Sequence, residues 1–177
     1  IKDVPYNQPL MYFAADHLIE KPNKLITAIN KNKYNLDEKN VFIFGIKPTS
    51  PSSEYGYFIT KKKKNINKVT KFIEKPKVSR ARQVIRQKGY WNSGMFFLRK
   101  DSIINNFKKY QPNIFRNCNK AVIKAKYKSS VYYLNKQSFS KATAKSFDYA
   151  ILEKTKNINA IKLDTVSYTH LRAHETP

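Results

Sequence analysis

Two neighbouring residues, Glu74 and Lys75, combine in one short segment the groups that a phosphorylated, hydroxyl-rich ligand would need. A carboxylate can accept hydrogen bonds from two adjacent hydroxyl groups, and an ammonium group can offset the charge of a phosphate. Neighbouring residues of a strand point to opposite faces, so both side chains reach one ligand only if the chain turns here, which Pro76 favours. A solvent-exposed ion pair at the end of a strand is the alternative interpretation.

A second group of candidate binding residues is Asn92, Ser93 and Gly94, together with Gly56. An amide supplies both a donor and an acceptor, which suits sugar hydroxyl groups. The chain has only 4 glycines, and a glycine lets a backbone approach a ligand closely. A bulge or a tight turn would require the same glycines, so that interpretation stays open beside the binding one.

Asp16 follows an apolar run, residues 9–15, that is typical of a buried parallel strand. In open α/β sheets ligands bind beyond the carboxyl ends of the strands. A carboxylate at that place can hold Mg²⁺, which prefers oxygen ligands and bridges substrate phosphates. A helix-capping aspartate is the alternative, because a helix is expected to follow.

Strands and helices alternate along the chain, which predicts an α/β fold with a mainly parallel mixed sheet flanked by helices. Strands 55–60 and 68–74 are expected to form one antiparallel ribbon, with the lysines of residues 61–64 at its tip. The other expected strands cover residues 9–15, 41–46, 90–99, 131–134 and 159–163, and the expected helices cover 24–33, 79–87, 102–110, 113–126 and a segment capped by Ser146.

The charge balance is strongly basic, with 35 Lys and Arg residues against 12 Asp and Glu residues and a formal net charge of +23. Only six of the basic residues are arginine, the residue that favours specific nucleic-acid recognition. The residues Lys, Asn, Ile, Tyr and Phe, which are all read from AT-rich codons, are in excess together, so we interpret the lysine excess as compositional drift rather than as a nucleic-acid footprint. The single cysteine, Cys118, excludes an internal disulfide framework, and the longest apolar runs are too short to span a bilayer.

Five segments in this order resemble the mannose-1-phosphate guanylyltransferases (GDP-mannose pyrophosphorylases), a family of sugar-phosphate nucleotidyltransferases. The resemblance extends over residues 9–163, and the tryptophan-containing and Glu-Lys-Pro segments are the most specific. The segments are Ala14-Ala15-Asp16-His17, Tyr55-Gly56-Tyr57, Phe72-Ile73-Glu74-Lys75-Pro76, Tyr90-Trp91-Asn92-Ser93-Gly94-Met95-Phe96 and the stretch from Ser146 to Thr155.

The resemblance implies a Rossmann-like nucleotidyltransferase fold and nucleotidyl transfer from GTP to mannose 1-phosphate, giving GDP-mannose and pyrophosphate. It implies that Asp16 is the catalytic residue that holds Mg²⁺. Asp148, at the start of a helix that faces the sugar site, would contact the sugar-binding residues rather than the sugar itself. The residues that would bind the sugar phosphate are Gly56, Glu74, Lys75, Asn92, Ser93 and Gly94.

The resemblance also shapes our expectations for the chain ends. We interpret residues 1–164 as part of a nucleotidyltransferase domain that lacks the family's N-terminal glycine-rich loop and its C-terminal metal-binding segment. Residues 165–177 resemble translated sequencing adapter, a non-native tail. We therefore expect the 177-residue chain alone to be inactive.

For the intact enzyme we expect a cytoplasmic protein that binds GTP and mannose 1-phosphate, without a nucleic-acid or membrane partner. A homo-oligomer of that enzyme is compatible with the sequence. Two alternatives stay open: another sugar-1-phosphate nucleotidyltransferase, and a basic nucleic-acid-binding domain, which a strongly salt-dependent affinity would reveal.

Overall fold

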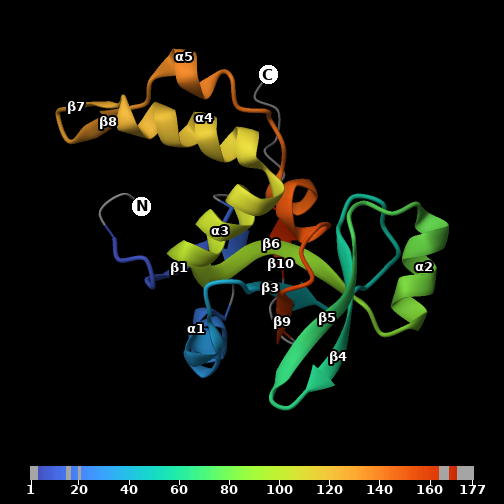
Figure 1. The fold of residues 1–177 in the computed structure, drawn as a ribbon. Coiled ribbons are helices and arrows are strands. Elements are labelled where there is room, and N and C mark those ends of the chain that lie inside the picture. The colour runs from blue at the N-terminus through green and yellow to red at the C-terminus, as the bar shows by residue number, and fades with distance from the viewer. Residues whose placement is uncertain (1–3, 15–16, 20, 164–167, 171–177) are drawn as a thin grey trace.

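The computed structural model describes residues 4–14, 17–19, 21–163 and 168–170, and its main feature is one central sheet (Figure 1). The strands of the central sheet are β1 (Pro9–Tyr12), β3 (Val41–Ile46), β4 (Tyr57–Lys63), β5 (Ile66–Ile73), β6 (Tyr90–Arg99) and β9 (Ile158–Leu163). Two smaller sheets pair β2 (His17–Ile19) with β10 (Tyr168–His170), and β7 (Lys126–Lys128) with β8 (Val131–Tyr133). The helices are α1 (Pro22–Asn32), η1 (Lys33–Asn35, a 3₁₀-helix), α2 (Val78–Arg86), α3 (Lys100–Tyr110), α4 (Pro112–Ile123), α5 (Lys136–Phe139) and η2 (Asp148–Leu152, a π-helix).

The central sheet is mixed and closes on itself. Its order is β1-β6-β3-β9-β5-β4, and β4 pairs with β6 as well, so the strands after β1 form a barrel-like ring. Within the described sheet only β3 and β9 pair in parallel; every other pair is antiparallel. The α/β class and the mixed sheet are thus confirmed, and the mainly parallel arrangement is wrong.

The reason lies in the strand pairing. Alternating strands and helices give parallel pairs only when consecutive strands become neighbours. Helix α2 leads from β5 to β6, but β6 pairs with β1, β3 and β4 rather than with β5, and it runs antiparallel to all three. For the same reason β1, expected to be a buried parallel strand, is a half-buried antiparallel neighbour of β6.

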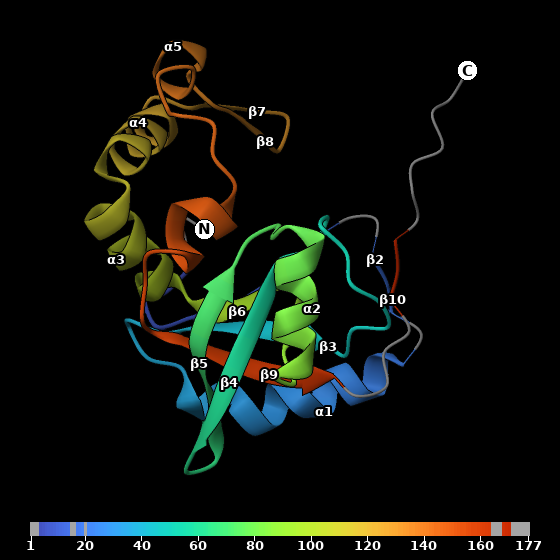
Figure 2. The same cartoon turned by 90° about the vertical axis from the view of Figure 1, so that its right-hand side faces the viewer.

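Strand β3 is buried along its whole length and separates two apolar layers. Phe42 and Phe44 pack with Leu25 of α1 on one face. Val41 and Ile43 belong to the cluster on the other face, which includes residues of α3 and η2. Helix α1 therefore covers one side of the sheet, and α3 with η2 covers the other. Helix α2 packs beside β4 through contacts with Tyr57 (Figure 2).

Strands β4 and β5 form the expected antiparallel ribbon. The turn falls at Lys64 and Asn65, and Lys64 has a positive φ of 53°, as a tight hairpin turn requires. The preceding lysines, residues 61–63, belong to β4 itself.

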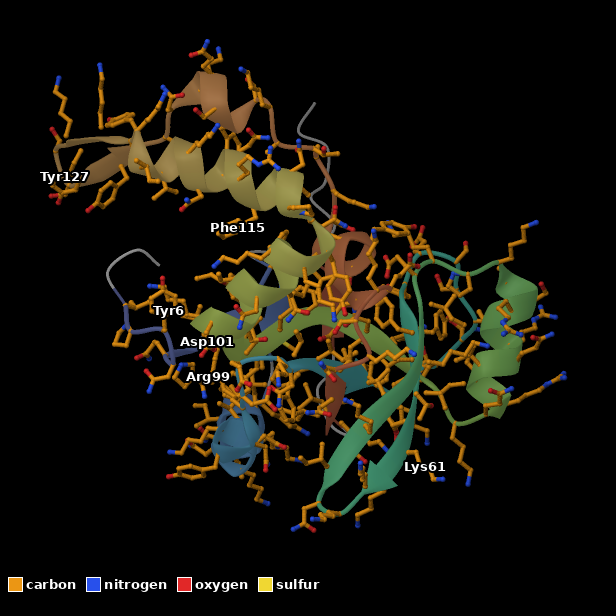
Figure 3. The ribbon with its side chains drawn as sticks, in the orientation of Figure 1. Tyr6, Lys61, Arg99, Asp101, Phe115 and Tyr127 are labelled. Carbon is orange, nitrogen blue, oxygen red and sulfur yellow. The ribbon has the colours of Figure 1, made fainter. Side chains whose placement is uncertain are left out.

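Residues 112–139, which we call the arm, comprise α4, β7, β8 and α5 and project from the rest of the molecule (Figure 1). Tyr127, at the outer end of the arm in Figure 3, pairs with Tyr132 across the hairpin with ring centroids 4.7 Å apart. The two side chains are 63% and 57% exposed. None of the helices among the described residues is long and apolar enough to cross a membrane.

Candidate active site

Four of the predicted site residues, Gly56, Glu74, Asn92 and Asp148, come together although they span 93 positions of the sequence. The backbone N–H of Asn92 donates to the carbonyl of Gly56 at 2.7 Å, which ties β6 to the residue before β4. The side-chain Nδ2 of Asn92 donates to Oδ1 of Asp148 at 2.8 Å. Asn92 is only 8% exposed, so the contact with Asp148 is largely shielded from water.

Glu74 lies one residue beyond the end of β5. Its Oε2 atom is buried and has no hydrogen-bond partner among the described residues. A Cβ atom on Gly56 would collide with this oxygen, so the missing side chain of Gly56 is what makes room for the Glu74 carboxyl. A buried polar atom without a partner is costly, which marks it as an atom that a ligand can satisfy.

The turn that Glu74 and Lys75 need in order to serve one ligand is present. Lys75 has a φ of 44°, in the left-handed region, so the chain leaves the alternation of the strand immediately after Glu74. The Lys75 side chain is exposed, yet its charge lowers the pKa of both Glu74 and Asp148. Lys75 therefore lies close enough to act electrostatically on both carboxyls.

Strand β6 bulges at Ser93 and Gly94. Ile43 and Gly45 of β3 pair with Phe96 and Asn92, so β6 holds extra residues at this point. Gly94 has a φ of 75°, and its N–H is 3.4 Å from the Oδ1 atom of Asn92, which accepts the hydrogen bond. Ser93 is buried, and its Oγ accepts from the N–H of Met95 at 3.2 Å. The bulge interpretation of Gly94 is confirmed, and such bulges redirect side chains near active sites.

Burial and neighbouring charges change the protonation of both carboxyls. Burial, reinforced by the negative charges of Asp148 and Glu153 and opposed by Lys75, raises the pKa of Glu74 to about 7. Burial also raises the pKa of Asp148, against the hydrogen bonds from the backbone and Asn92. Because burial and the neighbouring negative charges both favour its neutral form, the Glu74 carboxyl changes its protonation near neutral pH rather than near 4.5.

An aromatic cavity of about 400 Å³ adjoins this cluster at Gly94. The hydroxyl of Tyr12 is buried without a partner among the described residues, and burial raises the pKa of Tyr12. The sequence patterns did not predict this cavity, because its side chains come from separate elements. They also did not predict that the exposed Glu153 raises the pKa of Glu74. The cavity is lined by Tyr12, Phe13, Ala14, Gly94, Phe96, Leu98, Ile103, Phe107 and Phe147.

Asp16, expected to hold the metal, lies outside the described residues, between the end of β1 at Tyr12 and the start of β2 at His17. Over the described ranges, no three His, Cys, Asp or Glu side chains gather in a way that could hold a metal ion. The donor set of the described carboxyl cluster therefore does not by itself amount to a metal site.

Comparison with known proteins identifies a matching family and similar proteins. The model of the family "Nucleotidyl transferase" matches residues 2–149. The xanthan biosynthesis protein XanB of Xanthomonas campestris pv. campestris (strain B100) is 31% identical over 156 residues, which is 88% of this chain and 33% of that protein. A mannose-1-phosphate guanylyltransferase of Klebsiella pneumoniae is 33% identical over 165 residues, or 89% of this chain and 35% of that protein. The chain thus spans about a third of the length of the curated relatives it matches.

Among solved structures, one described as a mannose-6-phosphate isomerase from Helicobacter pylori has a TM-score of 0.82 at 24% identity, covering 94% of this chain and 65% of that one. Another, described as a mannose-1-phosphate geranyltransferase from Thermus thermophilus, has a TM-score of 0.77 at 20% identity, covering 92% and 46%. At these identities the likeness establishes the fold.

Proposed function

We propose that this chain, which belongs to the nucleotidyl transferase family, carries the sugar-phosphate site of an enzyme that makes GDP-mannose and pyrophosphate from GTP and mannose 1-phosphate. Relatives named mannose-1-phosphate guanylyltransferase support this choice of sugar and nucleotide. Nucleotidyl transfer by the whole protein is part of the proposal, as are both substrates.

The observation that carries the proposal is the unsatisfied Oε2 atom of Glu74, in the space that Gly56 leaves open beside Asn92. Sugar hydroxyl groups both donate and accept hydrogen bonds, so they can satisfy the Glu74 carboxyl and the backbone of the β6 bulge together. A ligand without hydroxyl groups would leave that oxygen unpaired and would bind more weakly.

Lys75 supplies the positive charge that a sugar 1-phosphate requires next to these carboxyls. In the proposed reaction, one phosphate oxygen of mannose 1-phosphate forms a bond to the α-phosphorus of GTP. The bond from that phosphorus to the bridging oxygen of the β-phosphate breaks, and pyrophosphate leaves with the electron pair. No protein nucleophile is required, so the residues of this chain bind and orient the attacking phosphate.

We further propose that Asp16 provides a carboxylate for Mg²⁺, which when bound would offset phosphate charge. The same proposal includes GTP as the nucleotide and Mg²⁺ as the cation. It also includes a cytoplasmic location and a homo-oligomeric whole protein. Asp16 is the residue whose replacement by alanine separates metal binding from sugar binding: the variant should keep its affinity for mannose 1-phosphate measured without metal.

Isothermal titration of the chain with mannose 1-phosphate tests the proposal. We expect saturable binding that Lys75→Ala weakens about tenfold, since a charge-assisted hydrogen bond from an ammonium group to phosphate contributes on the order of 1.4 kcal/mol. Lys61→Ala is the matched control, because Lys61 is an exposed lysine on β4 (Figure 3) and should leave the affinity within about twofold.

Two comparison ligands sharpen the result. Mannose lacks the phosphate and inorganic phosphate lacks the sugar, so each should bind far more weakly than mannose 1-phosphate. Equal losses in Lys75→Ala and Lys61→Ala, or equal affinity for inorganic phosphate and mannose 1-phosphate, would show that the lysine-rich surface merely attracts anions. Tighter binding of glucose 1-phosphate would favour another sugar-1-phosphate nucleotidyltransferase.

A further inference from the structure

We propose that Asp148 is a positioning residue for this site, because its carboxylate orients the Asn92 amide, which lies with Glu74 beside Gly56. The inference rests on the proposed function in one respect, namely that Glu74 and Asn92 face the sugar phosphate. The placement of Asp148 itself is independent of the substrate, because it follows from contacts within the ligand-free chain.

The orientation of Asn92 follows from what a carboxylate can do. An ionised carboxylate only accepts hydrogen bonds, so Asp148 must be approached by the NH₂ group of Asn92, and its Oδ1 accepts from Nδ2 at 2.8 Å. The Oδ1 atom of Asn92 is thereby directed to the other side, where the N–H of Gly94 lies 3.4 Å away. Without Asp148, the amide could reverse and exchange its donor and acceptor.

Asp148 also acts on Glu74, and it favours the protonated form of the Glu74 carboxyl. Asp148 has a donor, Asn92, that stabilises its charged form, whereas Glu74 Oε2 has no donor among the described residues. When two nearby carboxyls cannot both ionise easily, the one with the donor takes the charge and the other keeps the proton. The groups that act on Glu74 are Asp148 and Glu153, which favour its proton, and Lys75, which opposes it.

The local backbone explains why Asp148 can reach Asn92. Asp148 begins the π-helix η2, and its carbonyl accepts from the N–H of Glu153 at 3.0 Å, five residues on. The wider π-helical turn changes the direction of the side chains relative to an α-helix, and such turns are frequent at functional sites. Phe147, just before it, packs on Phe96 of β6 with ring centroids 4.6 Å apart, which anchors the start of η2 to the bulged strand.

A neutral Glu74 has a chemical consequence. The incoming sugar phosphate is an anion, and a second ionised carboxylate beside Asp148 would repel it. Holding the proton on Glu74 lowers that repulsion and gives its carboxyl a donor as well as an acceptor for hydroxyl groups. Asp148 would thus act on the substrate through its two neighbours, without touching it.

The test is the titration of the Glu74 side-chain carboxyl, followed by ¹³C NMR in the ligand-free full chain. Asp148→Asn keeps an acceptor for Asn92 and removes the charge, so the Glu74 midpoint should fall below about 7, although burial still keeps it above the ordinary value of 4.5. The Asn92 side-chain amide signals should shift less than in Asp148→Ala. Asp148→Ala removes both, so the midpoint should fall and the amide signals should shift. Glu153→Gln is the matched control: it should lower the midpoint less than Asp148→Asn, with the amide signals unchanged.

Mannose 1-phosphate binding at pH 5.5 supplies the second readout, since Glu74 keeps its proton there in wild type. Asp148→Ala should weaken binding about tenfold, the effect of losing one charge-assisted hydrogen bond, and Asp148→Asn should restore it to within about threefold. A folded Asp148→Asn protein with an unchanged Glu74 midpoint would overturn the proposal, as would an Asp148→Asn affinity as weak as that of Asp148→Ala. If wild type binds no mannose 1-phosphate, the proposed function fails, and the NMR titration still decides the role of Asp148.

Discussion

The closed sheet and the arm differ in how their residues are held. In the sheet, Asn92 is fixed by Gly56 and by Asp148, which are 36 and 56 positions away in the sequence. In the arm, β7 pairs with the neighbouring β8 and α4 packs against α5, and the exposed surface carries Tyr127 and Tyr132. Between Asp101 and Asp148 the chain has ten basic residues and no acidic one. The two site carboxyls with raised pKa values, Glu74 and Asp148, therefore lie outside the arm, beside the closed sheet, where burial raises their pKa values.

The largest expected effect comes from the core of the sheet. Phe58 is 1% exposed, stacks on Tyr90 with ring centroids 5.9 Å apart and fills the space beside Gly45. Phe58→Ala should lower the free energy of unfolding by about 3–5 kcal/mol in urea titrations. Phe139→Ala, at a phenylalanine of the arm that is 51% exposed, should cost less than about 1 kcal/mol. Similar losses would mean that the arm is as much a part of the core as the sheet is.

The strands of this region were well predicted from local patterns. Strands β3 and β6 have the expected bounds, residues 41–46 and 90–99. The uninterrupted apolar run of β3 fits a buried strand, and the aromatic residues of β6 favour extended structure. Their pairing was not predictable in the same way. The direction of β6 depends on which strands become its neighbours, and no property of residues 90–99 states that β3, rather than β5, will lie beside it.

The next largest effect concerns the space beside Glu74. Gly56→Ala places a methyl group against the Glu74 carboxyl, and the resulting overpacking should cost about 1–3 kcal/mol and weaken mannose 1-phosphate binding. In the double variant with Glu74→Ala the stability cost of the added methyl group should largely disappear, which a double-mutant cycle measures. An equal cost in both backgrounds would show that Phe72 or Asn92, each 3.4 Å from the added carbon, causes the strain instead.

The candidate site shows which of its features residue patterns can predict and which they cannot. Residue types made the Glu74-Lys75 and Asn92-Gly94 segments candidates, and the family resemblance assigned them to the sugar phosphate. The turn that Glu74 and Lys75 require could be stated in advance, because side chains alternate along a strand. The raised pKa of Glu74 could not be stated, since Asp148 lies 74 residues further along and becomes a neighbour only through the closure of the sheet. The hydrogen bond from Asn92 to Asp148 could not be predicted either, because it also depends on the closure of the sheet.

A smaller effect should appear in the pH dependence of stability. The folded-state pKa of Glu74 is raised to about 7 from 4.5, so between these values the folded chain binds more protons than the unfolded chain. The stabilisation is present below pH 4.5 and is lost as the pH rises through 7, so the free energy of unfolding decreases over that window. Glu74→Gln should flatten the decrease, by on the order of 1 kcal/mol after allowance for solvent screening.

Urea titrations at pH 5 and pH 8 measure this effect in both proteins. Glu54→Gln is the matched control, because Glu54 is exposed in the loop before β4 and its replacement should leave the wild-type profile unchanged. If Glu74→Gln and wild type follow the same profile, the carboxyl is charged in the folded chain at neutral pH, and the contrast in protonation between the sheet and the arm disappears.

The smallest effect is expected at the tip of the arm. Tyr127→Ala removes one cross-strand aromatic contact at a residue that is 63% exposed, and such pairs contribute about 0.2–1 kcal/mol. Hydrogen exchange should quicken in β7 and β8 and stay unchanged in β3 and β6, because the hairpin pairs only within itself. Faster exchange throughout the sheet would contradict this, since it would require Tyr127 to stabilise strands that it does not contact. Local opening confined to β7 and β8 would instead show that this hairpin and the sheet that carries the site are separate units of stability.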